Sequence, residues 1–174
     1  MTKRKAQHST GARPKVQRIK ESLDELYLRA DPRNISDPEL AGDLSRYLCV
    51  RVSGFLEQAV VLILREYCSR NSWGSVQAFA HSWLDKAPNM NSQALVKLVR
   101  RFDPSWADDL IDFLADDERY SSLNALVGIR NDIAHGRDQS LSRENVWNYL
   151  RVTEEIIEWL LVRLEPGTPL EQHG

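Results

Sequence analysis

The sequence predicts an all-α fold, a helical bundle with two long antiparallel helices and shorter helices between them. Apolar residues recur at steps of three and four through most of the 174-residue chain, which places them on single helix faces. No segment shows the alternation of apolar and polar residues that is typical of a half-buried strand. Helix start and stop signals separate the periodic segments and define the elements in order.

The first predicted helix begins near Pro14 and ends at Asp31-Pro32. A much longer helix follows, from Ser36 to about Arg70, and Ser36 with Glu39 forms the expected capping box at its start. Gly54 costs this helix about 1 kcal/mol of propensity, which predicts the close approach of another helix. The apolar stripe of the long helix comprises Leu40, Leu44, Leu48, Val52, Phe55, Ala59, Ile63 and Tyr67, widened by Leu56, Val60 and Leu64.

Four shorter helices are predicted next. Residues 75–84 form the first, and Asn91 or Ser92 caps the second, which runs to Phe102. Asp103-Pro104 opens the third, and residues 116–118 place three acids at the start of the fourth. The side chains expected to face inward are Val76, Phe79, Ala80 and Trp83, then Leu95, Leu98 and Val99, then Leu123, Leu126 and Val127.

The last predicted helix is capped by Ser140 or Ser142 and runs to about Leu164. Its inward positions follow a heptad rhythm, and they are Val146, Leu150, Thr153, Ile157, Leu160 and Leu164. The chain therefore divides into a disordered basic tail at 1–14, a helical domain at 15–165 and a flexible C-terminus at 166–174.

The charge of the chain is uneven. The net charge is −2, but the N-terminal residues carry +5 and no acid, so the remainder carries −7. These cations are Lys3, Arg4, Lys5, Arg13 and Lys15. A basic tail can hold nucleic acid without reading its sequence, or it can serve solubility alone.

Composition excludes several classes of protein. No apolar run reaches the roughly 18 residues of a membrane span, and no secretory signal follows the basic N-terminus, which predicts a cytoplasmic protein. Cys49 and Cys68 lie far apart in one predicted helix, so we expect two buried free thiols. The four histidines show no metal-ligand spacing, and we expect neither a structural metal nor a cofactor.

The segment Arg130-Asn131-Asp132-Ile133-Ala134-His135-Gly136 concentrates the chemistry of the chain. Asn131 and His135 are four apart and share one helix face, whereas Arg130 lies about 140° away and must curl back. Gly136 is suited to a left-handed helix cap, which places the histidine in the last turn. Histidine at a helix end is commonly only a cap, and the arginine and aspartate can form a plain surface ion pair. The combination, however, also suits proton transfer near neutral pH.

The motif has an arginine and a histidine separated by four residues, and the first of these four is polar. This pattern resembles the signature of the HEPN superfamily. The segment Tyr47-Leu-Cys-Val-Arg-Val-Ser-Gly-Phe-Leu-Glu57, followed by Glu66-Tyr67, is similar to the RiboL-PSP-HEPN group, which includes the MAE-type members. The resemblance covers roughly residues 36–165. It implies a HEPN-like bundle and a metal-independent endoribonuclease, commonly a homodimeric toxin or antiphage effector restrained by an antitoxin or another defence partner.

Carried over by position, Arg130 and His135 match the defining residues and Asn131 the polar one. RNA carries its own nucleophile, the 2′-OH, so cleavage needs a group that moves a proton and a cation for the phosphate oxygens. His135 suits the first task and Arg130, as a planar fork, suits the second. Asn131 can orient the imidazole or hold the ribose, Asp132 can orient the imidazole or pair outward, and Glu57 can pair with Arg130 or stay exposed.

Two other functions remain open at this point. A non-catalytic HEPN module would bind nucleotide, RNA or protein through the same motif without cleaving. A plain helical scaffold would use Arg130 and His135 only for capping and pairing, and the intact spacing of the motif argues against it.

Overall fold

The computed structural model describes residues 11–85, 89–137 and 139–164. These residues form α-helices and one 3-10 turn and contain no strand, which confirms the all-α prediction. The helices are α1 (Ala12–Arg29), α2 (Pro38–Asn71), α3 (Gly74–Leu84), α4 (Ser92–Arg100), α5 (Pro104–Ala115), α6 (Arg119–Ala134) and α7 (Arg143–Leu164), with the 3-10 turn at Pro32–Asn34.

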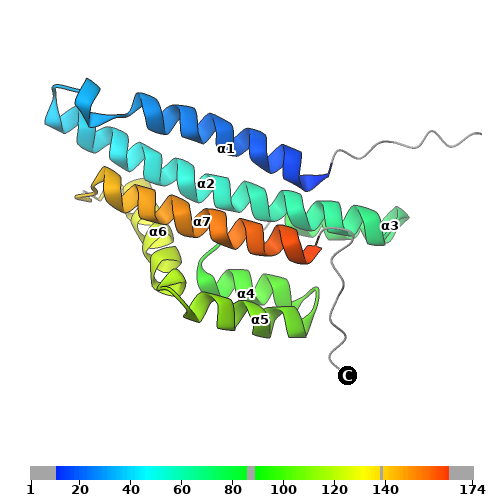
Figure 1. The fold of residues 1–174 in the computed structure, drawn as a ribbon. Coiled ribbons are helices and arrows are strands. Elements are labelled where there is room, and N and C mark those ends of the chain that lie inside the picture. The colour runs from blue at the N-terminus through cyan, green and yellow to red at the C-terminus, as the bar shows by residue number, and fades with distance from the viewer. Residues whose placement is uncertain (1–10, 86–88, 138, 165–174) are drawn as a thin grey trace, which may run out of the picture.

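Helix α2 lies at the centre of the bundle and contacts α1, α3, α6 and α7 (Figure 1). The predicted stripe is buried from Leu48 to Leu64, whereas Leu40 in the first turn is exposed. By length and composition alone α2 could cross a membrane, because an 18-residue window has a mean hydropathy of 1.6. More than half of that window is buried inside the bundle, and the core helix of a bundle also meets this criterion of length and hydropathy. The arrangement is consistent with a soluble protein.

The two longest helices run parallel, so the antiparallel arrangement predicted from the sequence is wrong. At one end, Arg46 of α2 donates to the carbonyl of Gln139, just before α7; at the other, Arg70 donates to the carbonyl of Leu164. The antiparallel neighbour of α2 is α1, since Lys15 near the start of α1 pairs with Glu66 late in α2. The segment from α3 to α6 returns the chain to the starting end of α2 before α7 begins (Figure 1).

Three helices begin at side-chain caps that the sequence predicts. Asn91 accepts from the amide of Ala94, and Asp103 accepts from the amide of Ser105. Ser142, one of two predicted candidates, accepts from the amide of Asn145 at 3.1 Å. The long helix differs, because Asp37 rather than Ser36 caps it, accepting from the amide of Glu39 at 2.9 Å.

Gly54 does not mark a close helix contact, which corrects the explanation offered for it. A Cβ added there would meet only the side-chain amide of Gln58, at 3.9 Å. The glycine therefore leaves space on the surface of α2 rather than admitting a neighbouring backbone.

Two of the cations assigned to a basic tail belong to the helical bundle. Helix α1 starts at Ala12, so Arg13 lies in its first turn and forms a two-point ion pair with Glu158 of α7. Lys15 lies 3.7 Å from the carboxylate of Glu66. Both side chains tie α1 to the bundle. Lys3, Arg4 and Lys5, like the predicted flexible segment 166–174, lie outside the described residues.

Helix α3 exposes side chains that were expected to be buried. Ala80 and Trp83 pack on the core as predicted, and Arg101 lies over the Trp83 ring. Val76 and Phe79 point to solvent, with Phe79 72% exposed, and Trp73 before the helix is 85% exposed. The helix contacts α2 on one side only, so the apolar residues on its other side stay uncovered.

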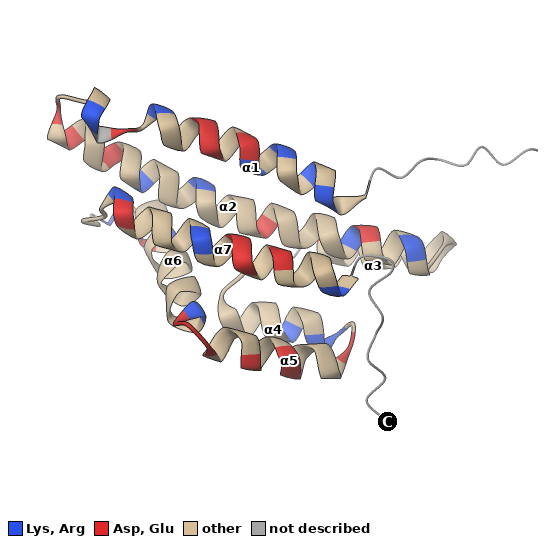
Figure 2. Cartoon of the chain, in the orientation of Figure 1, with Lys and Arg blue, Asp and Glu red and all other residues tan. Residues whose placement is uncertain are grey.

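Acidic residues gather on α5 and on the turn that follows it (Figure 2). The three acids predicted to favour the start of α6 do not cap it, because Glu118, the N-cap residue, makes no side-chain bond there. Asp117 and Glu118 instead take left-handed backbone angles in a tight turn. Asp116 and Asp117 both direct their carboxylates at Arg119, the first residue of α6.

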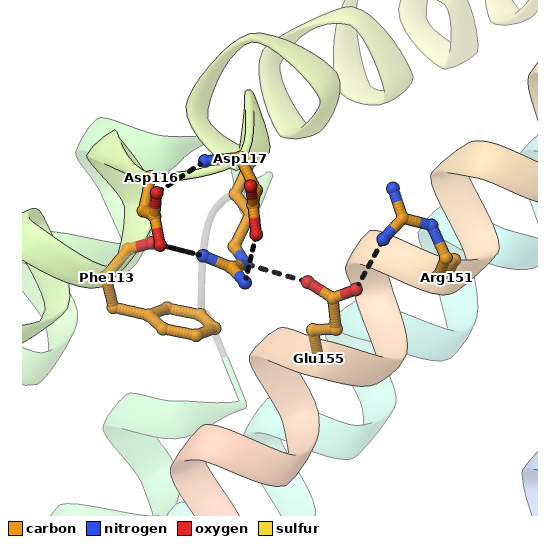
Figure 3. Close-up of polar contacts among 6 residues, drawn as sticks. Phe113, Asp116, Asp117, Arg151 and Glu155 are labelled. Carbon is orange, nitrogen blue, oxygen red and sulfur yellow. Dashed lines mark hydrogen bonds and ion pairs between the residues drawn. The ribbon is translucent and has the colours of Figure 1, made fainter.

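Arg119 joins this turn to α7 (Figure 3). Its guanidinium donates to Glu155 at 2.7 Å, to the carbonyl of Phe113 at 3.2 Å and to Asp117 at 3.2 Å. Only 13% of the Arg119 side chain is exposed, and these bonds raise its pKa, Glu155 contributing most. The contacts hold the N-terminal end of α6 against α7.

Replacing Arg119 by alanine tests this junction. The change removes one of the two donors to the partly buried Glu155 carboxylate and the Arg119 bond to the Phe113 carbonyl. We therefore expect a loss of about 2 kcal/mol in the free energy of unfolding. The control is Arg151→Ala, which removes the exposed second partner of Glu155 and should cost about 0.5 kcal/mol or less. Urea denaturation measures both. Equal losses for the two variants would contradict the role assigned to Arg119.

Candidate functional site

The Arg130–His135 motif occupies the C-terminal turn of α6 and is closed by the predicted glycine cap. The helix ends at Ala134, so His135 is the C-cap residue, one position beyond the helix. Gly136 has φ +71°, its amide donates to the carbonyl of Ile133, and the amide of Arg137 donates to the carbonyl of Asp132. This pair of bonds is a Schellman motif, which fixes the path of the chain directly after the histidine.

Two further contacts fix α6 along its length. Asn124, in the middle of the helix, accepts from the amide and the hydroxyl of buried Ser92 at 3.2 and 2.8 Å. Asn131, near its end, accepts from the side-chain amide of Asn89 at 3.2 Å. With Arg119 at its start, the helix is anchored at three levels, and the motif is therefore held on a rigid element. Sequence reasoning missed Asn89 and Asn124, because amides in loops and on helices give no periodic signal.

Arg130 and Asn131 are in direct contact. The guanidinium donates from Nη1 to the Asn131 Oδ1 at 3.1 Å, so the arginine does curl back toward the face that Asn131 occupies. Both side chains are half-buried. Asn131 Oδ1 thus accepts two hydrogen bonds, and its amide N–H groups remain as donors. The other N–H groups of Arg130 have no partner among the described residues, which leaves the fork available to a phosphate.

His135 is exposed at the end of the helix. Its backbone amide donates to the carbonyl of Asn131 at 3.0 Å, but no polar contact to its imidazole is found within the described part of the chain. The ring can therefore exchange protons with solvent or with a bound group. It has no protein partner there to set its orientation.

Asp132 does not orient the imidazole. Its carboxylate accepts from Arg137 at 2.8 Å and from the side-chain amide of Gln139 at 2.8 Å. Gln139 in turn accepts from Arg46 of α2 through its carbonyl, at 3.4 Å. Asp132 thus connects the turn after the motif to α2, which is the outward pairing that the sequence left as its alternative.

Glu57 shows no contact with Arg130. One of its carboxylate oxygens is buried and has no hydrogen-bond partner in the described structure. The side chain lines a pocket of about 370 Å³ beside α2. Glu57 therefore lines this pocket and is not paired with Arg130, which it was expected to support.

The cysteines take no part in the motif. Both are buried, and burial raises the pKa of the Cys49 thiol to about 12 and also raises that of Cys68. Neither thiol is a nucleophile at neutral pH. No group of three His, Cys, Asp or Glu side chains that could hold a metal ion is found among the residues described.

Comparison with known proteins gives one match. A family model described as RiboL-PSP-HEPN matches residues 15–160, most of the chain. No curated protein and no solved structure matches it.

Two glycines of α6 provide a matched test of the cap. Gly136→Ala forces a left-handed angle on a residue with a Cβ, so we expect a loss of about 1 kcal/mol in the free energy of unfolding. Gly128→Ala, in the same helix and in open space, should instead raise it by up to about 1 kcal/mol. Urea denaturation measures both variants. Equal stability of Gly136→Ala and Gly128→Ala would contradict the role assigned to the Gly136 cap.

Proposed function

The chain belongs to the RiboL-PSP-HEPN family, and from this membership and the geometry of its motif we propose that it is an endoribonuclease. The observation that carries the proposal is the rigid turn at the end of α6, which presents Arg130, Asn131 and exposed His135 together. Family membership by itself supports an RNase or a nucleotide-binding module. Arginine with unused donors beside an accessible imidazole is the combination that phosphate cleavage needs.

The proposed reaction is a transesterification within the RNA strand. The 2′-OH attacks the adjacent phosphorus, a P–O2′ bond forms and the P–O5′ bond breaks. The products are a 2′,3′-cyclic phosphate and a free 5′-OH. His135 takes the proton from the 2′-OH or gives one to the leaving O5′, and Arg130 bridges two phosphate oxygens as their charge develops. Asn131 holds the ribose or phosphate through its amide N–H groups.

The charge distribution supports RNA binding at the motif rather than on α5. The acidic side chains of α5 and its following turn are Asp108, Asp109, Asp112, Asp116, Asp117 and Glu118, and they repel a phosphate backbone (Figure 2). The motif lies at the other end of α6, where Arg46 and Arg137 pair with Asp43 and Asp132, and Arg130 has no carboxylate partner among the described residues. The anionic strand is thus drawn to the end of the bundle that carries His135.

We also infer that the active form is a homodimer. One chain supplies one histidine to the motif, whereas an in-line reaction is served best by one group that takes a proton and another that gives one. Exposed apolar side chains support a partner at this end of the bundle, because Leu40 and Tyr47 lie early in α2 and Trp147 lies in the first turns of α7. A cytoplasmic toxin or antiphage effector, held in check by an antitoxin or another defence protein, fits such an enzyme.

Cleavage chemistry gives the main test. In excess EDTA, we expect the purified protein to cut RNA to products that end in a 2′,3′-cyclic phosphate and to leave DNA intact, because DNA lacks the 2′-OH. His135→Ala should lose about 10²–10⁴-fold in rate, and Arg130→Lys should also fail, because a point charge cannot replace a bidentate fork.

The control for this test is His81→Ala, since His81 lies on α3 and its polar contacts within the described chain are with Ser69 and the carbonyl of Arg65. It should cleave like the unchanged protein. RNA binding with no cleavage by the unchanged protein would support the non-catalytic module instead. Cleavage that survives in His135→Ala would refute the mechanism.

The dimer has a separate test. Light scattering should give twice the 20.0 kDa mass of the chain at micromolar concentration. Tyr47→Glu should give monomers with little activity, because it places a charge on the proposed contact surface. Phe79→Glu is the control, since α3 contacts α2 at Arg65 and Ser69, roughly 30 Å along α2 from Arg46. A monomer in the unchanged protein, or a dimer broken only by Phe79→Glu, would count against this surface.

A further inference from the structure

The pocket beside Glu57 has the size and the walls of a binding site for a flat ring. It measures about 370 Å³, within the range of small-ligand pockets. Its apolar wall is formed by Val61 and Leu62 of α2, Leu84 at the end of α3 and buried Met90 before α4. A planar group that enters is therefore covered by aliphatic side chains, which suits a nucleobase better than a charged group.

The pocket is connected to the motif through the residues before α4. Met90 lines it, and the preceding residue, Asn89, donates to Asn131 of the motif. Arg46 lies eleven residues before Glu57 on the same face of α2, about 16 Å away along the helix. Arg46 contacts the turn that follows His135. A strand whose phosphate sits at Arg130 can therefore place a neighbouring base in the pocket.

The polar groups of the pocket are mainly acceptors. Glu57 and Asp85 both line it, so a phosphate is repelled. Asp85 already pairs with Arg65, whereas the buried oxygen of Glu57 has no donor within the described chain. A buried acceptor without a donor is costly, and a carboxylate accepts through both oxygens. Because this oxygen is covered in the structure, a ligand bonds it only once the Glu57 side chain turns toward the pocket. The ligand that then satisfies both oxygens presents N–H groups, ideally two that are adjacent.

We propose that this pocket binds a guanine base of the RNA substrate, with the Glu57 carboxylate accepting from N1–H and from the 2-amino group. Guanine is the RNA base whose edge carries two adjacent donors of this kind, whereas adenine and cytosine offer one amino group and uracil one imino group. The amide of Gln58, at the same pocket, provides a donor for O6. The inference rests on the proposed ribonuclease function, and it assigns that enzyme a preference for cleavage beside guanosine.

The test uses oligouridylates that carry one guanosine, adenosine or inosine at a central position. We expect kcat/KM for cleavage near the guanosine to exceed that for adenosine by roughly tenfold or more, with inosine between them because it keeps N1–H and lacks the amino group. In Glu57→Gln the ratio of guanosine to adenosine should fall to near one. In Glu158→Gln, the same substitution at a carboxylate of α7 that pairs with Arg13 and does not line the pocket, the ratio should persist.

Base preference separates this proposal from a purely structural role for Glu57. A uniform fall in rate on all three substrates in Glu57→Gln, or no preference in the unchanged protein, would overturn the guanine pocket and leave the ribonuclease intact. If no RNA is cut, the same three sequences as 2′-O-methyl oligomers are compared by fluorescence anisotropy. Tighter binding of the guanosine oligomer, lost in Glu57→Gln, would support the pocket while the enzyme proposal fails; equal binding of all three would overturn it.

Discussion

The apolar surface of α2 is the constraint on which the rest of the structure depends. Thirty-four residues without a break make a helix about 50 Å long, and buried residues lie on more than one side of it, since Phe55 and Leu64 are about 180° apart around the axis. A single neighbour cannot cover such a helix. Helices α1 and α7 lie along its length, while α3 and α6 close the remaining sides, so the position of α6 and of its motif follows from covering α2.

Local chemistry explains which parts of the fold the sequence could predict. Helix caps are short-range, so Asn91, Asp103 and Gly136 were identified from their own neighbours in the chain. Periodicity likewise gave six of the nine buried residues of α7, and it missed Val152, Ile156 and Leu161. Neither signal contains the direction of a distant helix. The parallel course of α2 and α7 depends on how the segment from α3 to α6 returns the chain, and it could not be read from the two stripes.

The candidate site shows the same division. The spacing of Arg130, Asn131 and His135 was visible because it lies within two helix turns. Their supports were not, since Asn89 and Ser92 come from a loop and a helix end distant in sequence, and Gln139 lies in the loop after the motif. The pocket beside Glu57 also depends on Leu84 and Met90, which are distant from Glu57 in the sequence and come next to it only in the folded chain. The sequence therefore predicted the reacting groups, but it did not predict the contacts that hold these groups in place.

The central claim is that the 2′-OH next to the scissile phosphate is the nucleophile and that the motif on α6 activates it. It is tested most directly by an RNA with a single cleavage site and a matched strand in which only the nucleotide 5′ to that site lacks its 2′-OH. The account predicts that the unchanged strand is cut there and that the matched strand stays intact at that position. Cleavage of the matched strand at the same phosphate would contradict it.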